Sequence, residues 1–437
     1  MLQKEALDVM KMGYNVYLTG EAGTGKTYVL NQYIKYIRNK NINIAVCAST
    51  GIAATHLDGV TVDSWSGLGI RDYITDREIR ALSAKHHLRK RIAETNILVI
   101  DEISMIDAMR FDAVDRILKY IRKNDSPFGG LQVILCGDLF QLPPVSPDRG
   151  HVNYIFKSRS WQGLNLKICY LTVPKRQSDK LLIRILTEIR HGNVSPSSRE
   201  VLSENIRKPH NNIHMTPKLY THNIDVDSIN LLELDKIRGE PRYYFMTSTG
   251  PEKLTEMIKK TCLAPEKLTL KKGALVMFVR NNFEKGYVNG TLGKVDSFNR
   301  NDEPIIKTYS GKKITVEPAD WTIGEKNRAI AQIRQIPLRL AWAITVHKSQ
   351  GMTLDAAEID LSKSFLEGMG YVALSRVKSL KGLKLLGINE MAYRVNQEVS
   401  KFDKKLMEFS NSTSLELRKM GWIRRWLKRR QFIYNHT

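Results

Sequence analysis

GEAGTGKT, Gly20 to Thr27, is the stretch that decides the fold, and it stands between the apolar run YNVYLT and a segment with helical spacing of apolar residues. It matches the pattern GxxxxGK[ST] in the strand, loop and helix setting that this pattern requires. Glycines let backbone N–H groups turn inward around phosphate oxygens, and the N-terminus of the following helix adds partial positive charge. We therefore predict a phosphate-binding loop formed by Gly20, Glu21, Ala22, Gly23, Thr24, Gly25, Lys26 and Thr27.

Within this loop, Lys26 is expected to reach the β and γ phosphates of ATP, and Thr27 is expected to ligate Mg²⁺. A second apolar run, ILVIDEIS, ends in Asp101 and Glu102. Asp101 is placed to hold Mg²⁺, and Glu102 is placed to activate the attacking water. A third run, VILCGD, leads to Gln141 in a proline-stiffened turn, where its side chain could sense the γ-phosphate. The loop and the carboxylate pair together predict hydrolysis rather than simple nucleotide binding.

Short apolar runs alternate with helical patterns along the chain, which predicts βαβ units, parallel sheets and hence an α/β fold. The first core is expected to have strands over residues 14–19, 42–48, 97–100 and 131–136, and helices over 26–38 and 107–122. A charged stretch, residues 68–94, interrupts this core as a small inserted subdomain.

A second α/β pattern begins near residue 166 and includes an expected helix over residues 179–191. It resumes over residues 336–346 and ends around residues 383–387. Between these parts, residues 271–334 change to short β runs with Gly and Asn turns, which predicts an inserted β-barrel.

Charge and composition indicate the kind of partner. The 437 residues carry 68 Lys+Arg against 45 Asp+Glu, a formal net charge of +23. This surplus favours a polyanion, with nucleic acid ahead of a membrane surface, although a merely soluble basic protein is the alternative. The longest apolar runs fall far short of the roughly 18 residues that cross a bilayer. The first residues, MLQKEALDVMKMG, resemble neither a signal nor a transit peptide, so we expect a reducing, cytoplasmic location.

The four cysteines, Cys47, Cys136, Cys169 and Cys262, form no CxxC or Cys/His cluster in the sequence. We interpret them as buried thiols rather than as a zinc site or a disulfide framework.

The motifs, in this order, resemble those of the superfamily-one helicases, and most closely the petite-integration-frequency (Pif) family, which is related to RecD and the phage Dda helicase. In the first half the matching blocks are ASTGIAA (residues 48–54), GVTVDSW (59–65), VIDEISMID (99–107) and CGDLFQLPPV (136–145). In the second half they are KRQSD around Arg176, DKLLIRILTEIRHG, LYTHNIDVDSIN (219–230), LAWAITVHKSQGMTL (340–354) and GYVALSRVKSLKGL (370–383).

This resemblance implies two RecA-like P-loop NTPase domains, residues 1–165 and 166–390, followed by a basic helical tail over 391–437. It also implies a wedge that separates strands at about 67–95 and an SH3-like β-barrel at about 271–334. The implied activity is an ATP- and Mg²⁺-dependent DNA helicase that moves 5′ to 3′ on single-stranded DNA, acts at junctions with duplex and unfolds G-quadruplexes. Such a protein would serve replication, repair or recombination as a monomer in a bacterial or phage-infected cell.

The resemblance also assigns roles to single residues. Gln3 would read adenine, and Arg176 and Arg376 would supply positive charge to the γ-phosphate. An arginine from a second domain would make that contact depend on domain closure. The full expected catalytic set is Lys26, Asp101, Glu102, Gln141, Arg176 and Arg376, and the nucleotide site also includes Gln350 and Gly351.

DNA contacts are expected from short polar or cationic side chains near strand ends and from one aromatic ring. The expected residues are Ser49, Thr50, Gly51, Ser64, Trp65, Thr345, His347, Lys348 and Ser349. For Trp65 two interpretations stay open, base stacking or a place in the core. Asp63 stands where relatives usually have His, so we do not expect Asp63 to contact DNA.

Residues 418–430 carry seven Lys or Arg and no acid, interleaved with Trp422, Ile423, Trp426 and Leu427 at helical spacing. Three interpretations of this tail stay open: an apolar face docked on the protein with the basic face solvated, a nucleic-acid contact, or a membrane or partner contact. For the whole chain, two alternatives to a DNA helicase remain, an ATP-gated nucleic-acid-binding translocase or switch without strand separation, and an RNA helicase.

Overall fold

The computed structural model describes residues 1–55, 57, 59–69, 71–144, 152–177, 179–207, 216–220, 226–282, 284–325, 328–346, 349 and 351–436. The chain divides into two compact units. The first unit consists of Met1–Arg176 together with Asn396–Thr437, and the second consists of Gln177–Val395. Each unit contains a parallel sheet, as the α/β prediction required.

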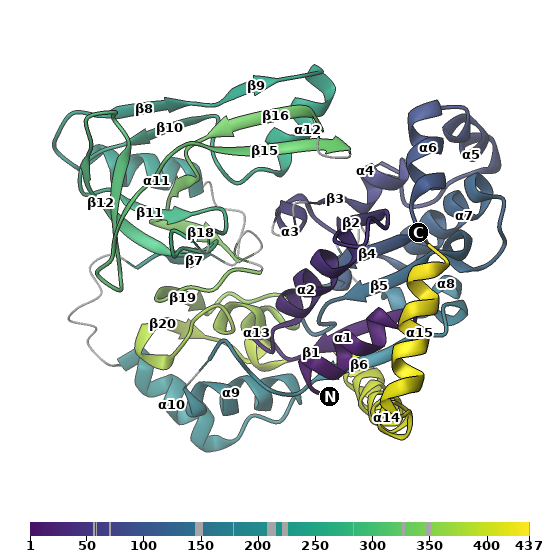
Figure 1. The fold of residues 1–437 in the computed structure, drawn as a ribbon. Helices are drawn as coiled ribbons and strands as arrows, with labels where there is room; N and C mark the ends of the chain where they lie inside the picture. The colour runs from purple at the N-terminus through teal and green to yellow at the C-terminus, as the bar shows by residue number, and fades with distance from the viewer. Residues whose placement is uncertain are drawn as a thin grey trace. The chain divides into compact units, whose positions relative to one another are not determined.

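A six-stranded sheet, entirely parallel and in the order β3-β2-β4-β5-β1-β6, forms the centre of the first unit (Figure 1). Every residue of β1, β4 and β5 is buried, because helices cover both faces of a parallel sheet. The strands are β1 (Val16–Gly20), β2 (Ile44–Ala48), β3 (Val60–Thr61), β4 (Ile97–Asp101), β5 (Gln132–Cys136) and β6 (Lys167–Leu171).

The helices of this unit start where the sequence supplies a cap or a turn. Gly25, in the left-handed region with φ 86°, begins α2, and the Asp107 carboxylate caps α7 by accepting the Met109 N–H. The helices are α1 (Gln3–Lys11), α2 (Lys26–Arg38), α3 (Gly51–Thr55), α4 (Val62–Ser66), α7 (Ala108–Arg122) and α8 (Arg159–Gly163). Short 3₁₀ turns add η1 (Ile103–Met105), η2 (Pro127–Gly130) and η3 (Ile155–Lys157).

The charged stretch between α4 and β4 folds as a pair of helices, α5 (Asp76–Ser83) and α6 (His86–Glu94). Thr75 and Glu78 form a capping box that starts α5. Four apolar side chains on the inner faces of this pair are buried, namely Ile79, Leu82, Leu88 and Ile92. We refer to residues 68–94 as the helical insertion.

Two C-terminal helices, α14 (Gln397–Lys419) and α15 (Trp422–Tyr434), belong to the first unit (Figure 1, yellow). The α14 helix lies against β6, where the Ser410 hydroxyl accepts the Tyr170 N–H at 3.0 Å.

The α15 helix is docked on α1 by its basic side, where Arg429 pairs with Asp8 at 2.8 Å and Phe432 is buried against Gly13. Trp422 and Trp426 are 73% and 48% exposed. Of the three interpretations left open for the tail, the structure shows docking on the protein, through a face that combines Arg425 and Arg429 with the buried Phe432.

The second unit has a four-stranded parallel sheet in the order β18-β7-β19-β20. Its strands are β7 (Lys218–Tyr220), β18 (Ala343–Thr345), β19 (Ala357–Leu361) and β20 (Leu383–Ile388). Its helices and turns are α9 (Lys180–Arg190), α10 (Pro196–Arg207), α11 (Val226–Asp235), α13 (Met369–Leu374), η4 (Leu380–Gly382) and η5 (Glu390–Tyr393).

Antiparallel strands form the rest of the second unit. They make a five-stranded sheet, β14-β13-β12-β11-β17, a three-stranded sheet, β15-β16-β9, and the pair β10-β8. The bounds are β8 (Arg242–Phe245), β9 (Thr247–Thr249), β10 (Lys267–Leu270), β11 (Leu275–Phe278), β12 (Leu292–Phe298), β13 (Pro304–Thr308), β14 (Lys313–Thr315), β15 (Ala319–Glu325), β16 (Arg328–Gln335) and β17 (Leu338–Leu340), with one helix, α12 (Glu252–Thr261).

The antiparallel part extends on both sides of the range expected for it. Pairing begins at β8, and β17 pairs antiparallel with β11, so only β18 of the expected 336–346 segment joins the parallel sheet. Among the described residues, no helix is long and apolar enough to span a bilayer. The expectation of buried thiols holds for Cys47, Cys136 and Cys169, and Cys262 is half-buried.

Candidate active site

The phosphate loop lies at the carboxyl end of β1, and its shape depends on glycines with positive φ angles. Gly20, Gly23 and Gly25 all have positive φ, at 142°, 82° and 86°. The ammonium group of Lys26 donates to the Gly20 and Glu21 carbonyls at 2.8 and 3.0 Å, and the Thr24 hydroxyl donates to the Glu21 carbonyl at 2.9 Å. Lys26 therefore lies folded over the loop, where phosphate oxygens could replace the carbonyls as its acceptors. Thr27 is exposed in the first turn of α2.

Gln3 contacts the same loop from α1. Its amide donates to the Thr24 carbonyl at 2.9 Å. A Cβ atom added to Gly25 would lie 2.2 Å from the Gln3 amide nitrogen, so only glycine leaves room for Gln3 at this point. The expected nucleotide-binding residues of the first half, from Gln3 to Thr27, are thus gathered around one loop.

Asp101 ends β4, the strand two places from β1 in the sheet, and Glu102 follows it. Asp101 is 6% exposed and accepts the Glu102 N–H at 2.8 Å. Burial raises the pKa of Asp101, and the hydrogen bonds from the Cys136 thiol and the Glu102 amide, with the nearby Lys26 charge, offset part of that rise. Glu102 has φ 52°, an unusual conformation for a residue with a side chain, which is typical of functional sites.

The turn after β5, which lies between β4 and β1, carries Gln141. Gln141 is 6% exposed, and its N–H donates to the Asp138 carbonyl at 2.9 Å. Asp138 is completely buried, and its carboxylate accepts the Phe140 N–H at 3.2 Å. These bonds fix the turn beside the carboxylates.

Arg176 also reaches the phosphate loop, through its backbone. The Lys175 and Arg176 N–H groups donate to the Gly23 carbonyl at 2.7 and 3.0 Å. Arg176 is the last residue of the first unit's N-terminal part, whereas we expected it to come from the second domain. Of the two arginines, only Arg376 belongs to the second unit.

Arg376 follows α13 in the second unit and is 1% exposed. Its guanidinium donates to the Val372 carbonyl at 2.9 Å, the Ser349 carbonyl at 3.3 Å and the Ser375 hydroxyl at 3.1 Å. These acceptors orient the arginine beside the segment that contains Ser349. Gly351 is exposed in this segment with φ 76°.

Comparison with known proteins identifies the family to which the chain belongs. The family model for PIF1-like helicases matches residues 3–198, and the model for the 2B domain of DNA helicase Pif1 matches residues 253–298. An ATP-dependent DNA helicase Pif1 from Psychrobacter is 42% identical over 94% of this chain and 71% of that protein. The chain belongs to the family of PIF1-like helicases.

Two solved structures support the same assignment. Bacteroides Pif1 in complex with ADP-AlF4 is 31% identical, with a TM-score of 0.79 over 94% of this chain and 97% of that one. Bacteroides Pif1 bound to ssDNA is 31% identical, with a TM-score of 0.64 over 92% of this chain and 96% of that one. The expected family and the fold class of two RecA-like domains with two insertions are thereby confirmed.

In this PIF1-like helicase, Ser49 joins an expected DNA segment to the backbone of Asp101 and Glu102. Its hydroxyl donates to the Glu102 carbonyl at 2.7 Å, and its N–H donates to the Asp101 carbonyl at 3.1 Å. Thr50 and Gly51 follow at the start of α3, where the Thr50 hydroxyl accepts the Ala53 N–H at 3.2 Å. All three residues are half-buried at the end of β2.

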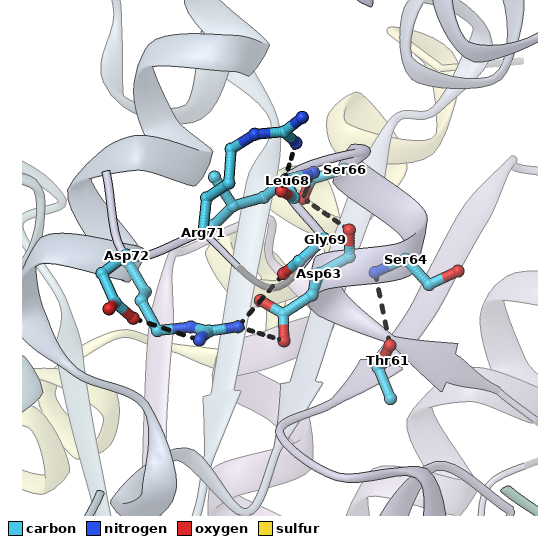
Figure 2. Close-up of polar contacts among 9 residues, drawn as sticks. Thr61, Asp63, Ser64, Ser66, Leu68, Gly69, Arg71 and Asp72 are labelled. Atoms are coloured by element: carbon cyan, nitrogen blue, oxygen red, sulfur yellow. Dashed lines mark hydrogen bonds and ion pairs between the residues drawn. The ribbon is translucent and has the colours of Figure 1, made fainter. Parts of the chain in front are cut away.

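The second expected DNA segment lies at the start of α4. Figure 2 shows Thr61 accepting the Ser64 N–H, at 3.3 Å, and the tight turn that follows it through Ser66 and Leu68. Ser64 is half-buried, and Trp65 is 4% exposed. The indole therefore belongs to the interior, and the stacking interpretation of Trp65 is not supported.

In the second unit, Thr345 is 7% exposed at the end of β18, and Ser349 is completely buried. The Ser349 hydroxyl donates to the Val346 carbonyl at 2.8 Å, so this group is already satisfied and is not offered to DNA. His347, Lys348 and Gln350 lie outside the described residues.

Two arginines that sequence reasoning missed hold the second DNA segment in place. Arg91 of α6 donates to the Ser64 carbonyl at 3.1 Å and to the Trp65 carbonyl, and Arg110 of α7 pairs with Asp63 at 2.7 Å. The sequence signal for Arg110 is Asp63, a carboxylate that needs a partner when half-buried, whereas the backbone carbonyls bound by Arg91 leave no signal in the sequence.

Proposed function

We propose that this chain is an ATP-dependent DNA helicase that moves 5′ to 3′ along single-stranded DNA and unwinds duplex DNA at junctions. The observation that carries the proposal is the bonding of Ser49 to both Asp101 and Glu102. Both bonds end on main-chain carbonyls, so a shift of the backbone at Asp101 and Glu102 during hydrolysis would displace a segment expected to contact DNA. Family membership supports the direction of movement, which no contact encodes.

The loop residues are suited to hold ATP. Lys26 exchanges its two carbonyl acceptors for phosphate oxygens, and the N–H groups at the start of α2 face the same site. Gln3 is placed to bind adenine at the edge of the loop. Glu102 orients and deprotonates the attacking water, and Gln141 contacts the γ-phosphate end.

Mg²⁺ fits the donors that remain. Thr27 offers an exposed hydroxyl, and Asp101 offers a buried carboxylate whose pKa is raised by burial, so an added cation would stabilise its charged form. When bound, the ion would neutralise negative charge on the phosphates.

Arg176 and Arg376 would supply further positive charge to the negatively charged γ-phosphate. Arg176 is tied to the loop through the Gly23 carbonyl, and Arg376 comes from the second unit. We propose that Arg376 reaches the γ-phosphate only when the units close, so closure reports bound ATP and drives stepping.

The proposed DNA track uses Ser49, Thr50, Gly51 and Ser64 of the first unit with Thr345, His347 and Lys348 of the second. The net charge of +23 supports a polyanionic ligand. We propose single-strand and duplex junctions as the substrates, G-quadruplexes as further substrates, a monomer as the active form and the bacterial or phage-infected cytoplasm as the location. Replication, repair or recombination would be the setting.

The test measures ATP hydrolysis with and without single-stranded DNA, together with unwinding of duplexes that carry a 5′ or a 3′ tail. Lys26→Ala should lower hydrolysis by about 10²-fold or more, because it removes a charge from the transferred phosphoryl group. Lys35→Ala is the matched control, since Lys35 is an exposed lysine on the same helix.

Unwinding from the 5′ tail alone, lost in Lys26→Ala and kept in Lys35→Ala, would support the proposal. DNA-stimulated hydrolysis without unwinding from either tail would instead indicate the translocase or switch. Absence of hydrolysis in the wild-type protein would refute the mechanism.

A further inference from the structure

Arg110 of α7 is the centre of a polar cluster at the root of the helical insertion. Its guanidinium contacts the Asp63 carboxylate at 2.7 Å, the Asp72 carboxylate at 3.3 Å and the Gly69 carbonyl at 3.2 Å. Asp63, Gly69 and Asp72, the three residues that accept these bonds, are labelled in Figure 2. The side chains of Arg110 and Asp63 are only 25% and 23% exposed, so solvent screens their pairing less than that of a surface pair.

The three acceptors come from different parts of the chain. Asp63 lies in α4, beside Ser64 and within the second expected DNA segment. Gly69 and Asp72 lie in the loop that connects α4 to α5. Arg110 itself is in the first turn of α7, which follows the carboxylate pair after a short 3₁₀ turn. One guanidinium therefore joins the DNA segment, the insertion and the helix that follows the hydrolytic site.

Other arginines also bind the helical insertion, but the contacts of Arg116 and Arg71 do not reach the expected DNA segment. Arg116, further along α7, donates to the Ile74 carbonyl at 2.7 Å and pairs with Asp76, which is 76% exposed. Arg71 pairs with Glu78 within the insertion itself. Arg91 of α6 also joins the insertion to the expected DNA segment, through the Ser64 and Trp65 carbonyls, whereas Arg110 joins both of them to α7.

The chemistry of the cluster requires arginine. A planar guanidinium offers several N–H groups in fixed directions, so it can bind two carboxylates and a carbonyl together, whereas a lysine ammonium cannot reproduce that geometry. Burial raises the pKa of Asp63, and the Arg110 charge opposes that rise. Without Arg110, the half-buried Asp63 carboxylate would lose its partner and the turn through Gly69 would lose a fixed point.

We infer that Arg110 is a positioning residue for strand separation, which holds the helical insertion in a fixed orientation to the DNA segment. This inference rests on the proposed helicase function. In the absence of Arg110 the insertion still folds around its own buried leucines and isoleucines and keeps the Arg91 and Arg116 contacts, but its root near Asp63 and Gly69 loses a fixed point and transmits the force of a duplex less efficiently. Hydrolysis and movement along a single strand then continue without efficient unwinding.

The test compares Arg110→Leu with the wild-type protein in two assays, single-strand-stimulated ATP hydrolysis and unwinding of a 5′-tailed duplex. We expect hydrolysis to stay within about twofold and unwinding to fall by about tenfold or more, because misplacement of a working group by about 1 Å can cost up to ~10²-fold. Lys119→Leu is the control, since Lys119 is a cation of the same helix that pairs with Asp115 within α7.

Two further variants separate positioning from loss of charge. The exchange Asp63→Arg with Arg110→Asp restores one ion pair but sets the new carboxylate beside Asp72 and leaves the Gly69 carbonyl without its donor, so it should recover only part of the lost unwinding rate. Arg110→Lys keeps the charge but loses the fork geometry, so its unwinding rate should lie between those of Arg110→Leu and the wild type.

Equal losses of hydrolysis and unwinding in Arg110→Leu, or no loss of either, would overturn the inference. Should Arg110→Leu fail to fold, as judged by its thermal transition, Asp72→Asn replaces it, because Asp72 is 64% exposed and its loss leaves the Asp63 pair intact. A smaller loss confined to unwinding is then expected, and unchanged unwinding would overturn the inference. Failure of the wild-type protein to unwind any tailed duplex would refute the proposed function itself.

Discussion

The phosphate loop and the root of the helical insertion are held by different kinds of contact. In the loop, Lys26 and Thr24 bond to backbone carbonyls within six residues of themselves, and three glycines supply the unusual dihedral angles. At the insertion root, Arg91 and Arg110 bond to groups 26 to 47 positions away in sequence. The loop is therefore a local backbone structure, whereas the root depends on long side chains from other helices.

Gly25→Ala is the most damaging single test of the local structure. It places a Cβ atom 2.2 Å from the Gln3 amide nitrogen, so the Gln3 side chain must move away, and it puts a side chain at a strained position with φ 86°. We expect nucleotide binding to weaken by at least about tenfold, equivalent to about 1.4 kcal/mol, since strained dihedrals alone cost of order 1–3 kcal/mol.

A fluorescent ATP analogue measures this affinity. The double variant Gly25→Ala with Gln3→Ala relieves the clash but not the dihedral strain, so it should recover only part of the loss. Full affinity in Gly25→Ala would show that the loop is not fixed by its backbone.

Arg91→Met tests the long-range contacts at the insertion root. The variant keeps an apolar stem but leaves the Ser64 and Trp65 carbonyls without their donor. An unsatisfied buried group costs about 1–3 kcal/mol, which lowers the melting temperature by about 2–4 °C per kcal/mol in a unit of this size. Calorimetry measures the shift, and Lys90→Met on the same helix is the control.

Hydrolysis by Arg91→Met should remain near the wild-type rate, because no loop residue contacts Arg91 among the interactions described. A variant that melts normally but no longer hydrolyses ATP would contradict the separation of the two regions.

These two regions also show how far sequence reasoning reaches. The loop, the strands that lead to it and α2 were predictable because a glycine pattern and apolar periodicity are local properties. The burial of Trp65 and Ser349 was not, because it depends on groups that pack over them. Nor was the docking of α15 by its arginines, since a helical pattern does not reveal that Asp8 lies opposite.

Asp101→Asn tests how much the buried charge next to the phosphate loop lowers the stability of the folded protein. The pKa of Asp101 is raised in the folded protein by burial, so its charged form is disfavoured by folding at neutral pH. We expect Asp101→Asn to abolish hydrolysis yet to raise the melting temperature without nucleotide, because the variant has no charge to bury.

The sign of the pH dependence follows from the direction of that shift. Below the ordinary pKa of aspartate, Asp101 is protonated in both folded and unfolded chains and the advantage of Asn disappears. As the pH rises through the raised pKa, the wild-type protein loses stability relative to the variant. A stabilisation that is equal at acid and neutral pH would show that the charge of Asp101 is not its cause.

The smallest expected effect concerns two thiols, one beneath each region. Cys47 in β2 neighbours Val60 of β3, and Cys136 lies beside Asp101. Burial raises the pKa of both thiols, so little thiolate is present at pH 8 and iodoacetamide should modify neither within the time that labels unfolded protein. Mass spectrometry of the peptides reads the result. In Arg91→Met we expect faster labelling of Cys47 than of Cys136, and the reverse order would mean that the loop region opens first.

The first unit is built from both ends of the chain, and this arrangement bears on how the protein is made. Arg176 ends its first part, yet the helix that covers β6 begins only at Gln397, after the whole second unit. A ribosome adding about 5–20 residues per second needs about 10–45 s to span that interval. During this time the β6 side of the nascent unit, including the Tyr170 amide that later bonds to Ser410, waits without its cover. We therefore expect chains that end before the last helices to depend on chaperones and to fold poorly. This holds even though their nucleotide loop is synthesised almost at the start.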